Sequence, residues 1–212
     1  MSQHARFAGL LSILSLLCAA QAVPAADLYK IDPVHTSVVF SVAHVGLSYT
    51  YGFFRKAGGN YILDETNPTN NRFQFIIQTE SLDTNNAERD DHLRGADFFN
   101  AQQFPEITFE STSCARINSP DNVVFQVAGN LTIHGVTRPI TIPLRMLGKG
   151  PGARKDPRTG FLCQIELKRS DYGMSNLLKD NMVGDAVGLT VSFEGSLQEQ
   201  AGAGPGIGNP RP

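Results

Sequence analysis

The 212-residue chain carries 18 lysines and arginines against 20 acidic residues, which gives a net charge of −2. This balance disfavours nucleic-acid binding, because neutralising phosphates requires a clustered basic face. A chain of this length can bury one sizeable core, and no internal repeat or linker divides it. With 13 phenylalanines and no tryptophan, phenylalanine supplies most of the rigid apolar surface for a core or a pocket.

The N-terminal residues have the pattern of a secretory signal peptide. Arg6 gives a short positive region, and the apolar run 7–20 follows it. The run is too short to span a bilayer, and small residues at 22–26 offer cleavage sites. We therefore expect residues 1–26 to be removed, the net charge to change from −2 to −3 with the loss of Arg6, and the protein to reach the periplasm. No later stretch is apolar enough for a transmembrane span.

Most of the segment 27–198 alternates between apolar and polar residues, which is typical of strands with one buried face. The alternating stretches are 37–45, 72–80, 107–117, 123–133, 140–146, 161–168 and 187–197. With 51–63 they make about eight strands, most of them longer than usual. Long strands joined by tight turns such as His134-Gly135 predict an all-β fold, an antiparallel lipocalin-like barrel of about eight strands with one or two short helices.

One short helix is expected between the strands. Asn85 can cap a helical turn that begins at Asn86, with Glu88 in the position of a capping box, and Gly95 can end it. The stretch 97–103 then reads as a second short helical or irregular segment before the next strand.

Three further stretches lack the strand pattern. The basic run 148–160 is expected to be a solvated hairpin loop, and 175–182 is either one helical turn or a loop. Residues 199–212 are rich in glycine and proline, so we expect a disordered tail after a single domain at 27–198.

Two cysteines, Cys114 and Cys163, follow the expected leader. Alternation places Cys114 on the polar face of its strand, opposite the apolar face that carries Ile107, Phe109 and Ile117, whereas Cys163 lies on an apolar face. A disulfide needs Cα atoms within about 7 Å and converging Cβ atoms. We therefore expect the two thiols to remain unpaired, although an oxidising compartment would permit a bridge.

The sequence shows no catalytic or metal-binding motif. The histidines at 35, 44, 92 and 134 have no metal-ligand spacing, and no nucleophile elbow or phosphate-binding loop occurs. His44 shares its parity with Phe40 and Val42, which predicts an interior or rim position. The acidic residues next to His92 alternate with arginines, which is typical of a solvated, ion-paired helix face.

Several segments resemble the YceI family of periplasmic, lipocalin-like polyisoprenoid-binding proteins. They are 29–46, 52–54, 81–111, 129–144 and 171–195, in that order, and they extend over essentially the whole of 27–198. The resemblance implies an eight-stranded antiparallel barrel whose elongated hydrophobic cavity holds an isoprenoid chain, such as the tail of a quinone, without covalent chemistry. It brings no catalytic set, and it does not extend to the tail at 199–212.

The candidate lining of the barrel follows from strand parity. It consists of Phe40, Val42, His44, Phe73, Phe75, Ile77, Phe98, Phe99, Phe109, Phe125, Val127, Leu131, Ile142, Leu144, Phe161, Ile165, Leu189, Val191 and Phe193. Phe98 and Phe99 are adjacent and cannot share a direction in a regular element. We expect one of them to anchor its segment across a barrel end and the other to touch the ligand or the entrance of its site.

Three functions are compatible with this pattern. The leading hypothesis is a periplasmic carrier or storage protein for an isoprenoid lipid or quinone, with no metal, no other cofactor and no catalysis. The alternative is a hydrolase or isomerase of a small apolar substrate that uses His44 or His92. A third hypothesis is a solid barrel whose outer surface binds a partner. The oligomeric state stays open.

Overall fold

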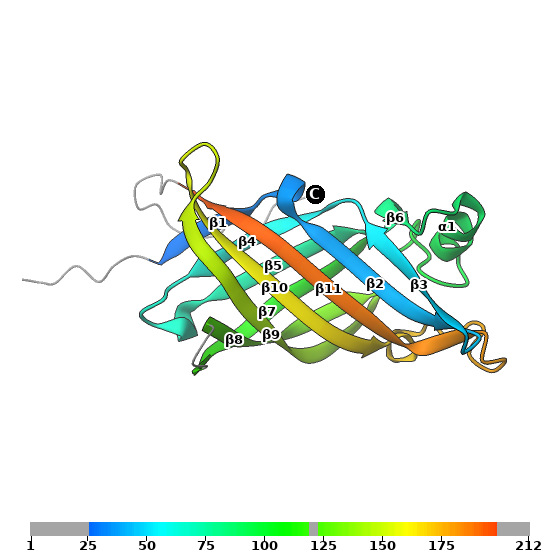
Figure 1. The fold of residues 1–212 in the computed structure, drawn as a ribbon. Coiled ribbons are helices and arrows are strands. Elements are labelled where there is room, and N and C mark those ends of the chain that lie inside the picture. The colour runs from blue at the N-terminus through cyan, green and yellow to red at the C-terminus, as the bar shows by residue number, and fades with distance from the viewer. Residues whose placement is uncertain (1–25, 119–122, 199–212) are drawn as a thin grey trace, which may run out of the picture.

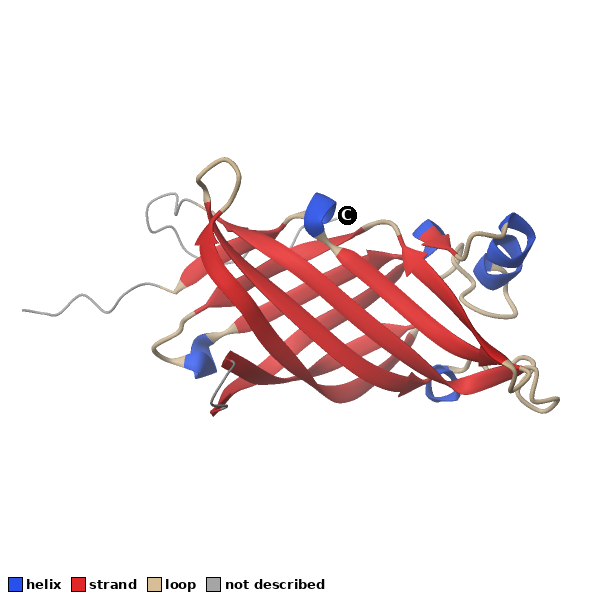
Figure 2. Ribbon diagram, viewed as in Figure 1, coloured by secondary structure: helices blue, strands red, loops and turns tan. Residues whose placement is uncertain are grey.

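The computed structural model describes residues 26–118 and 123–198, and almost all of them belong to β-strands (Figures 1 and 2). The expected signal peptide and the expected C-terminal tail lie outside the described residues. The strands are β1 Asp27–Ile31, β2 Ser37–His44, β3 Ser48–Phe54, β4 Ala57–Leu63, β5 Arg72–Gln78, β6 Leu82–Asp83, β7 Glu106–Asn118, β8 Val123–Ile133, β9 Val136–Pro151, β10 Pro157–Lys168 and β11 Val183–Leu197. The helix is α1 Ala87–Arg94, and single 3-10 turns are η1 Pro33–His35, η2 Pro68–Asn70, η3 Thr79–Ser81 and η4 Arg169–Tyr172.

The strands close into a barrel. Neighbours pair in the order β1, β4, β5, β7, β8, β9, β10 and β11, and β11 returns to β1. Every pairing in this ring is antiparallel. β1 and β2 both pair with β11 and act as two halves of one interrupted strand, and β3 and β4 continue each other in the same way. The predicted eight-stranded antiparallel barrel is therefore confirmed.

Local sequence explains the tight turn between β8 and β9. His134 has a φ of 51° and Gly135 a φ of 73°, the pair of left-handed conformations that a two-residue type I′ hairpin needs. A Cβ atom at Gly135 would meet the ring of Phe104, so a second reason favours glycine there. The predicted turn at this dipeptide is confirmed.

Helix α1 begins one residue later than expected. Asn86, not Asn85, is the cap, and its side-chain oxygen accepts a hydrogen bond of 2.9 Å from the Arg89 N–H. Asn85 instead adopts a left-handed φ of 62°, a conformation that asparagine tolerates, and this turn sets the helix start. Gly95 ends the helix as expected. The stretches 97–103 and 175–182 form turns rather than helices.

A bulge in β7 interrupts the alternation. The pairing of β7 with β8 shifts between Ser111 and Ser113, where an extra residue forms a bulge. A bulge reverses which side of the sheet the following side chains face. Cys114 is therefore buried with 4% of its surface exposed, and Ile117 is 43% exposed, so the expected faces of these two residues were wrong.

The barrel end at which β1 begins is filled by rings. Tyr29 stacks on Tyr61 with centroids 5.0 Å apart, and Tyr61 meets Phe73, Phe161 and Phe193 at 5.5 to 5.8 Å. We call these five residues the aromatic cluster. The buried Tyr61 hydroxyl hydrogen-bonds to Thr159 Oγ1, and burial raises the pKa of Tyr61 above its ordinary value. Close ring packing fills the interior between these side chains.

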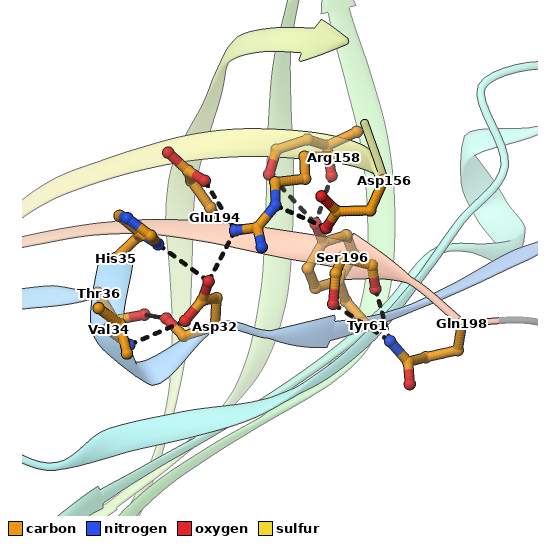
Figure 3. A network of polar contacts seen from close by, with 11 residues as sticks. Asp32, Val34, His35, Thr36, Tyr61, Asp156, Arg158, Glu194, Ser196 and Gln198 are labelled. Atoms are coloured by element: carbon orange, nitrogen blue, oxygen red, sulfur yellow. Dashed lines mark hydrogen bonds and ion pairs between the residues drawn. The ribbon is translucent and has the colours of Figure 1, made fainter. Parts of the chain in front are cut away.

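An ionic network holds the break between β1 and β2 against the barrel (Figure 3). Arg158 on β10 donates to Asp32 at 2.7 Å, to Asp156 at 2.8 Å and to Glu194 at 3.1 Å. Asp32 also caps η1 through the Val34 N–H and contacts the His35 ring at 2.9 Å. The hydrogen bonds with His35 and Arg158 hold the pKa of Asp32 well below its usual range.

Candidate functional site

Beyond the aromatic cluster the barrel interior contains two adjoining cavities. The inner cavity, in the middle of the barrel, has a volume of about 80 Å³, and the outer cavity, beneath the α1 segment, has a volume of about 110 Å³. Ile77 and Leu189 line both, so the two cavities meet at these side chains. Each is several times larger than the roughly 10–15 Å³ that one water molecule needs. This free space argues against a barrel that is solid throughout.

The inner cavity has an apolar wall. It adjoins the aromatic cluster, since Phe73 and Phe193 belong to its wall. Its lining consists of Ile31, Phe73, Gln74, Phe75, Ile77, Phe109, Leu131, Ile140, Ile142, Leu144, Cys163, Ile165, Leu189, Val191 and Phe193. The Gln74 side chain lies on the outer face, where its amide contacts Glu110 at 3.5 Å. An apolar cavity of this kind favours hydrocarbon over water.

The outer cavity is closed over by irregular segments as well as strands. Leu93, Phe98 and Phe99 cover it from the α1 side, and the region around η4 covers it from the other. Its lining consists of Phe40, Val42, Phe54, Ile77, Leu93, Phe98, Phe99, Ile107, Ile133, Leu167, Arg169, Tyr172, Met174, Val183, Val187 and Leu189. The α1 region lies at the end of the barrel opposite the start of β1, where the aromatic cluster is (Figure 1).

Among the residues that the structure describes, Arg169 is the one cation in the outer cavity wall. Only 6% of its surface is exposed, and its guanidinium donates to the carbonyls of Met174, Val183 and Gly184 at 2.8 to 2.9 Å. Burial lowers the pKa of Arg169 below its ordinary value. Met174 follows η4, and Val183 and Gly184 begin β11, so Arg169 holds the two ends of the segment 174–184 together beside the cavity.

Phe98 and Phe99 both line the outer cavity, because the turns at 97–103 free them from the alternation of a regular element. Phe98 is 5% exposed, packs edge-on against His92 at 5.0 Å and lies 6.0 Å from the Arg169 guanidinium. Phe99 is half-buried and packs against Phe54. The contacts of Phe98 are those of an anchor, and Phe99 is the less enclosed of the two.

Most of the candidate lining residues lie on the two cavities. These are Phe40, Val42, Phe73, Phe75, Ile77, Phe98, Phe99, Phe109, Leu131, Ile142, Leu144, Ile165, Leu189, Val191 and Phe193. Phe125, Val127 and Phe161 are fully buried in packed regions and line neither cavity. His44 is exposed at the last position of β2. Contact of any of these side chains with a ligand stays a prediction.

Sequence reasoning missed two kinds of lining residue. Ile107, Ile133, Leu167 and Val187 share the parity of residues that were chosen, so alternation could have found them. Leu93, Tyr172 and Met174 lie in α1, η4 and a turn, where a two-residue period carries no information. Their positions depend on how these segments pack across the barrel end.

The candidate catalytic histidines do not line either cavity. His92 is exposed on α1, where its Nε2 lies 3.3 Å from an Asp97 carboxylate oxygen, and His44 lies at the rim. Within residues 26–118 and 123–198, no group of three or more His, Cys, Asp or Glu side chains is arranged to hold a metal ion. The same residues contain no helix with the length and apolarity of a membrane span.

Cys114 and Cys163 are free and buried. Cys163 lines the inner cavity, and burial raises its pKa to about 12. Cys114 is close to Asn71, whose amide nitrogen lies 3.8 Å from the sulfur, and burial raises its pKa as well. At neutral pH both side chains are thiols, which behave as small apolar groups.

The fold and the cavities can be compared with known proteins. The family model of the YceI-like domain matches residues 29–195. Protein YceI of Escherichia coli O157:H7 is 37% identical over 191 residues, which cover 89% of this chain and 96% of that protein. The structure also matches the crystal structure of BcnA from Burkholderia cenocepacia, with a TM-score of 0.67 and 22% sequence identity. The match covers 77% of this chain and 98% of BcnA.

A second solved structure has the same fold. It is a domain of Saccharophagus degradans described as polyisoprenoid-binding and implicated in plant cell wall breakdown. The TM-score is 0.62 at 16% identity, and the match covers 80% of this chain and 98% of that domain. At these levels of identity the likeness to both solved structures shows the fold alone.

Proposed function

We propose, from the premise that the chain belongs to the YceI-like family, that its barrel binds the hydrocarbon chain of an isoprenoid lipid. The ligand is a quinone or a polyprenyl compound, and the protein carries or stores it in the periplasm without changing it chemically. The observation that carries this proposal is the pair of adjoining apolar cavities, which continue from the aromatic cluster to the α1 end.

The physical argument is one of apolar surface. Each methylene group that leaves water contributes about 0.8 kcal/mol. A few isoprene units therefore offer more than the roughly 8 kcal/mol of a micromolar complex, before the costs of association are subtracted. The lining offers such a chain isoleucine, leucine, valine and phenylalanine side chains. Branched and aromatic groups of this kind contact a methyl-branched chain well.

One known protein with this fold supports the ligand class. The Saccharophagus degradans domain, described as polyisoprenoid-binding, has the same barrel. Its low identity makes the resemblance a matter of fold, so the apolar cavities of this chain remain the main argument. The location in the periplasm rests on the pattern of residues 1–26, and cell fractionation with N-terminal sequencing of the mature protein tests it.

The binding proposal is tested by extracting the protein, purified without detergent, with organic solvent and analysing the extract by mass spectrometry. A delipidated sample is then titrated with a quinone of several isoprene units and, as a control, with the same quinone head group without a tail. We expect an isoprenoid in the extract and saturable binding of the tailed compound only. An extract without lipid, together with no binding of the tailed quinone, would overturn the proposal.

A further inference from the structure

The outer surface of the barrel carries an apolar stripe beside the outer cavity. Leu47 is 87% exposed, Tyr49 66%, Tyr51 61% and Phe53 41%. These residues alternate along β3 and its preceding turn, so their side chains share the outward face. Val45 and Met182 extend the stripe at the tip. We call these six residues the outer stripe.

The outer stripe and the cavity share one hairpin. Phe54 follows Phe53 in β3 and points inward, where it lines the outer cavity. Its partner strand β2 contributes Phe40 and Val42 to the same wall. At the tip the Val45 N–H donates to the Met182 carbonyl at 2.9 Å, so the β2–β3 turn and the segment before β11 protrude together (Figure 1).

Val45 occupies an unusual backbone position. Its φ is 44° and that of Gly46 is 70°, and the Leu47 N–H donates to the His44 carbonyl at 3.0 Å, as in a type I′ turn. Asparagine or glycine is favoured at such a position, whereas a β-branched residue is strained there. The chain therefore places an aliphatic side chain at the tip at a cost in stability, which points to a role for that side chain outside the folded barrel.

The stripe is graded along its length. From residue 45 to residue 54 there is no charged side chain. Aliphatic groups lie at the tip and the tyrosines come next. Along β3, charge begins at Arg55, which lies over the Phe53 ring at 5.0 Å and pairs with Asp83 at 2.8 Å, whereas beside Met182 the exposed Lys179 and Asp180 are charged. Proteins that contact a bilayer show this order, with aliphatic groups deepest, tyrosine at the headgroup level and charges in water.

We propose that the outer stripe docks the protein on the surface of a lipid bilayer, with Val45 and Leu47 in the hydrocarbon boundary. This inference deepens the proposed function and rests on it, because docking would bring the α1 end of the barrel to the source of the isoprenoid. Within the described residues, the free edge of β3 pairs only at Phe53 and Phe54, with β6. The backbone groups of residues 48–52 on that edge need water or headgroups, so the docking is shallow.

The test is flotation with vesicles of phosphatidylethanolamine and phosphatidylglycerol that contain no isoprenoid. Mass spectrometry first establishes where each purified chain begins, because residues 7–20 would themselves bind lipid, and preparations that retain them are set aside. We expect the protein to float and Leu47→Asn to lower the bound-to-free ratio about tenfold. The matched control is Val34→Asn. Val34 is 82% exposed at the other end of β2, and its replacement should leave flotation unchanged.

Val45→Asn gives a second readout. It should raise the melting temperature, because asparagine tolerates the left-handed turn, and lower vesicle binding. Absence of flotation by the unchanged protein overturns the inference, as does a dimer that Leu47→Asn converts to monomers without any vesicle binding. Vesicle binding without quinone binding would overturn the proposed function but not this inference. Quinone binding without vesicle binding would overturn this inference but not the proposed function.

Discussion

The ring of Phe99 meets the ring of Phe54 edge to face, with the centroids 5.6 Å apart and the planes at 90°. Phe54 belongs to the barrel wall, and Phe99 belongs to the cover that follows α1. This contact joins the cover to the wall directly over the outer cavity, and it leaves Phe99 less enclosed than its neighbour Phe98.

Alanine replacements at these two neighbouring positions should separate. Phe98→Ala should lower the free energy of unfolding by about 3 kcal/mol, because it removes a buried ring that packs on His92 and Arg169. Phe99→Ala should cost less stability and weaken isoprenoid binding about tenfold. Urea denaturation and a quinone titration measure the two effects. Equal losses of stability and affinity in both variants would contradict the assigned roles.

Filling the inner cavity should block ligand binding. Val191 lines this cavity, so Val191→Phe can place its ring in free space with a small cost in stability and should abolish binding of a long isoprenoid. Val127 is fully buried and lines neither cavity, so Val127→Phe should overpack the core and lower the free energy of unfolding by about 1–3 kcal/mol. Thermal melting of both variants and titration of Val191→Phe check this. Unchanged quinone affinity in Val191→Phe would move the ligand elsewhere.

Loss of the hydroxyl should change the free energy of unfolding differently at the two stacked tyrosines of the aromatic cluster. Tyr61→Phe leaves the buried Thr159 hydroxyl without its partner and should cost about 1–3 kcal/mol. The Tyr29 hydroxyl, whose pKa is raised by burial and by the nearby Asp27, has no well-formed hydrogen-bond partner among the described residues, so Tyr29→Phe should be neutral or stabilising. Both variants keep the stacked rings. Chemical denaturation decides, and a large loss in Tyr29→Phe would reveal a partner for that hydroxyl.

Acid should weaken the fold partly through Asp32. Its folded pKa lies below the unfolded value of about 4, so the carboxylate stabilises the protein above that pH, and this contribution is lost as the pH falls toward the folded pKa. We expect Asp32→Asn to be less stable than the unchanged protein at pH 7 and to lose less stability on acidification. Asp64, Asp83 and Asp185 also have lowered pKa values and should retain part of the slope. Melting temperatures between pH 7 and pH 3 measure it, and parallel curves would assign the acid sensitivity to other groups.

Strand parity predicted the barrel and much of the cavity wall because the period of two is a local property. It worked in β2, β5 and β8, where Phe40, Phe75 and Leu131 face inward as alternation requires. It failed beyond the bulge in β7, since one extra residue reverses the faces and no sequence pattern marks Ser111–Ser113 as the place.

Strand parity also does not predict which inward-facing side chains line a cavity and which are packed on all sides. Phe161 and Phe193 share a parity and are both buried, yet Phe161 is enclosed by other rings and Phe193 reaches the inner cavity. That difference is set by packing across the barrel between residues distant in sequence. Parity also could not predict the cover residues Tyr172 and Met174, because their segment has no repeating apolar pattern.

If the barrel binds an isoprenoid chain as proposed, the packed rings of the aromatic cluster would block its passage at that end of the barrel. A tail that entered beneath the α1 segment would stop at Tyr61 and Phe161 and would leave by the same route, with its head group nearest the opening. A pocket closed at one end would limit the length of chain that it encloses. One molecule would have to leave before another could enter. Exchange between two membranes would then proceed strictly one lipid at a time.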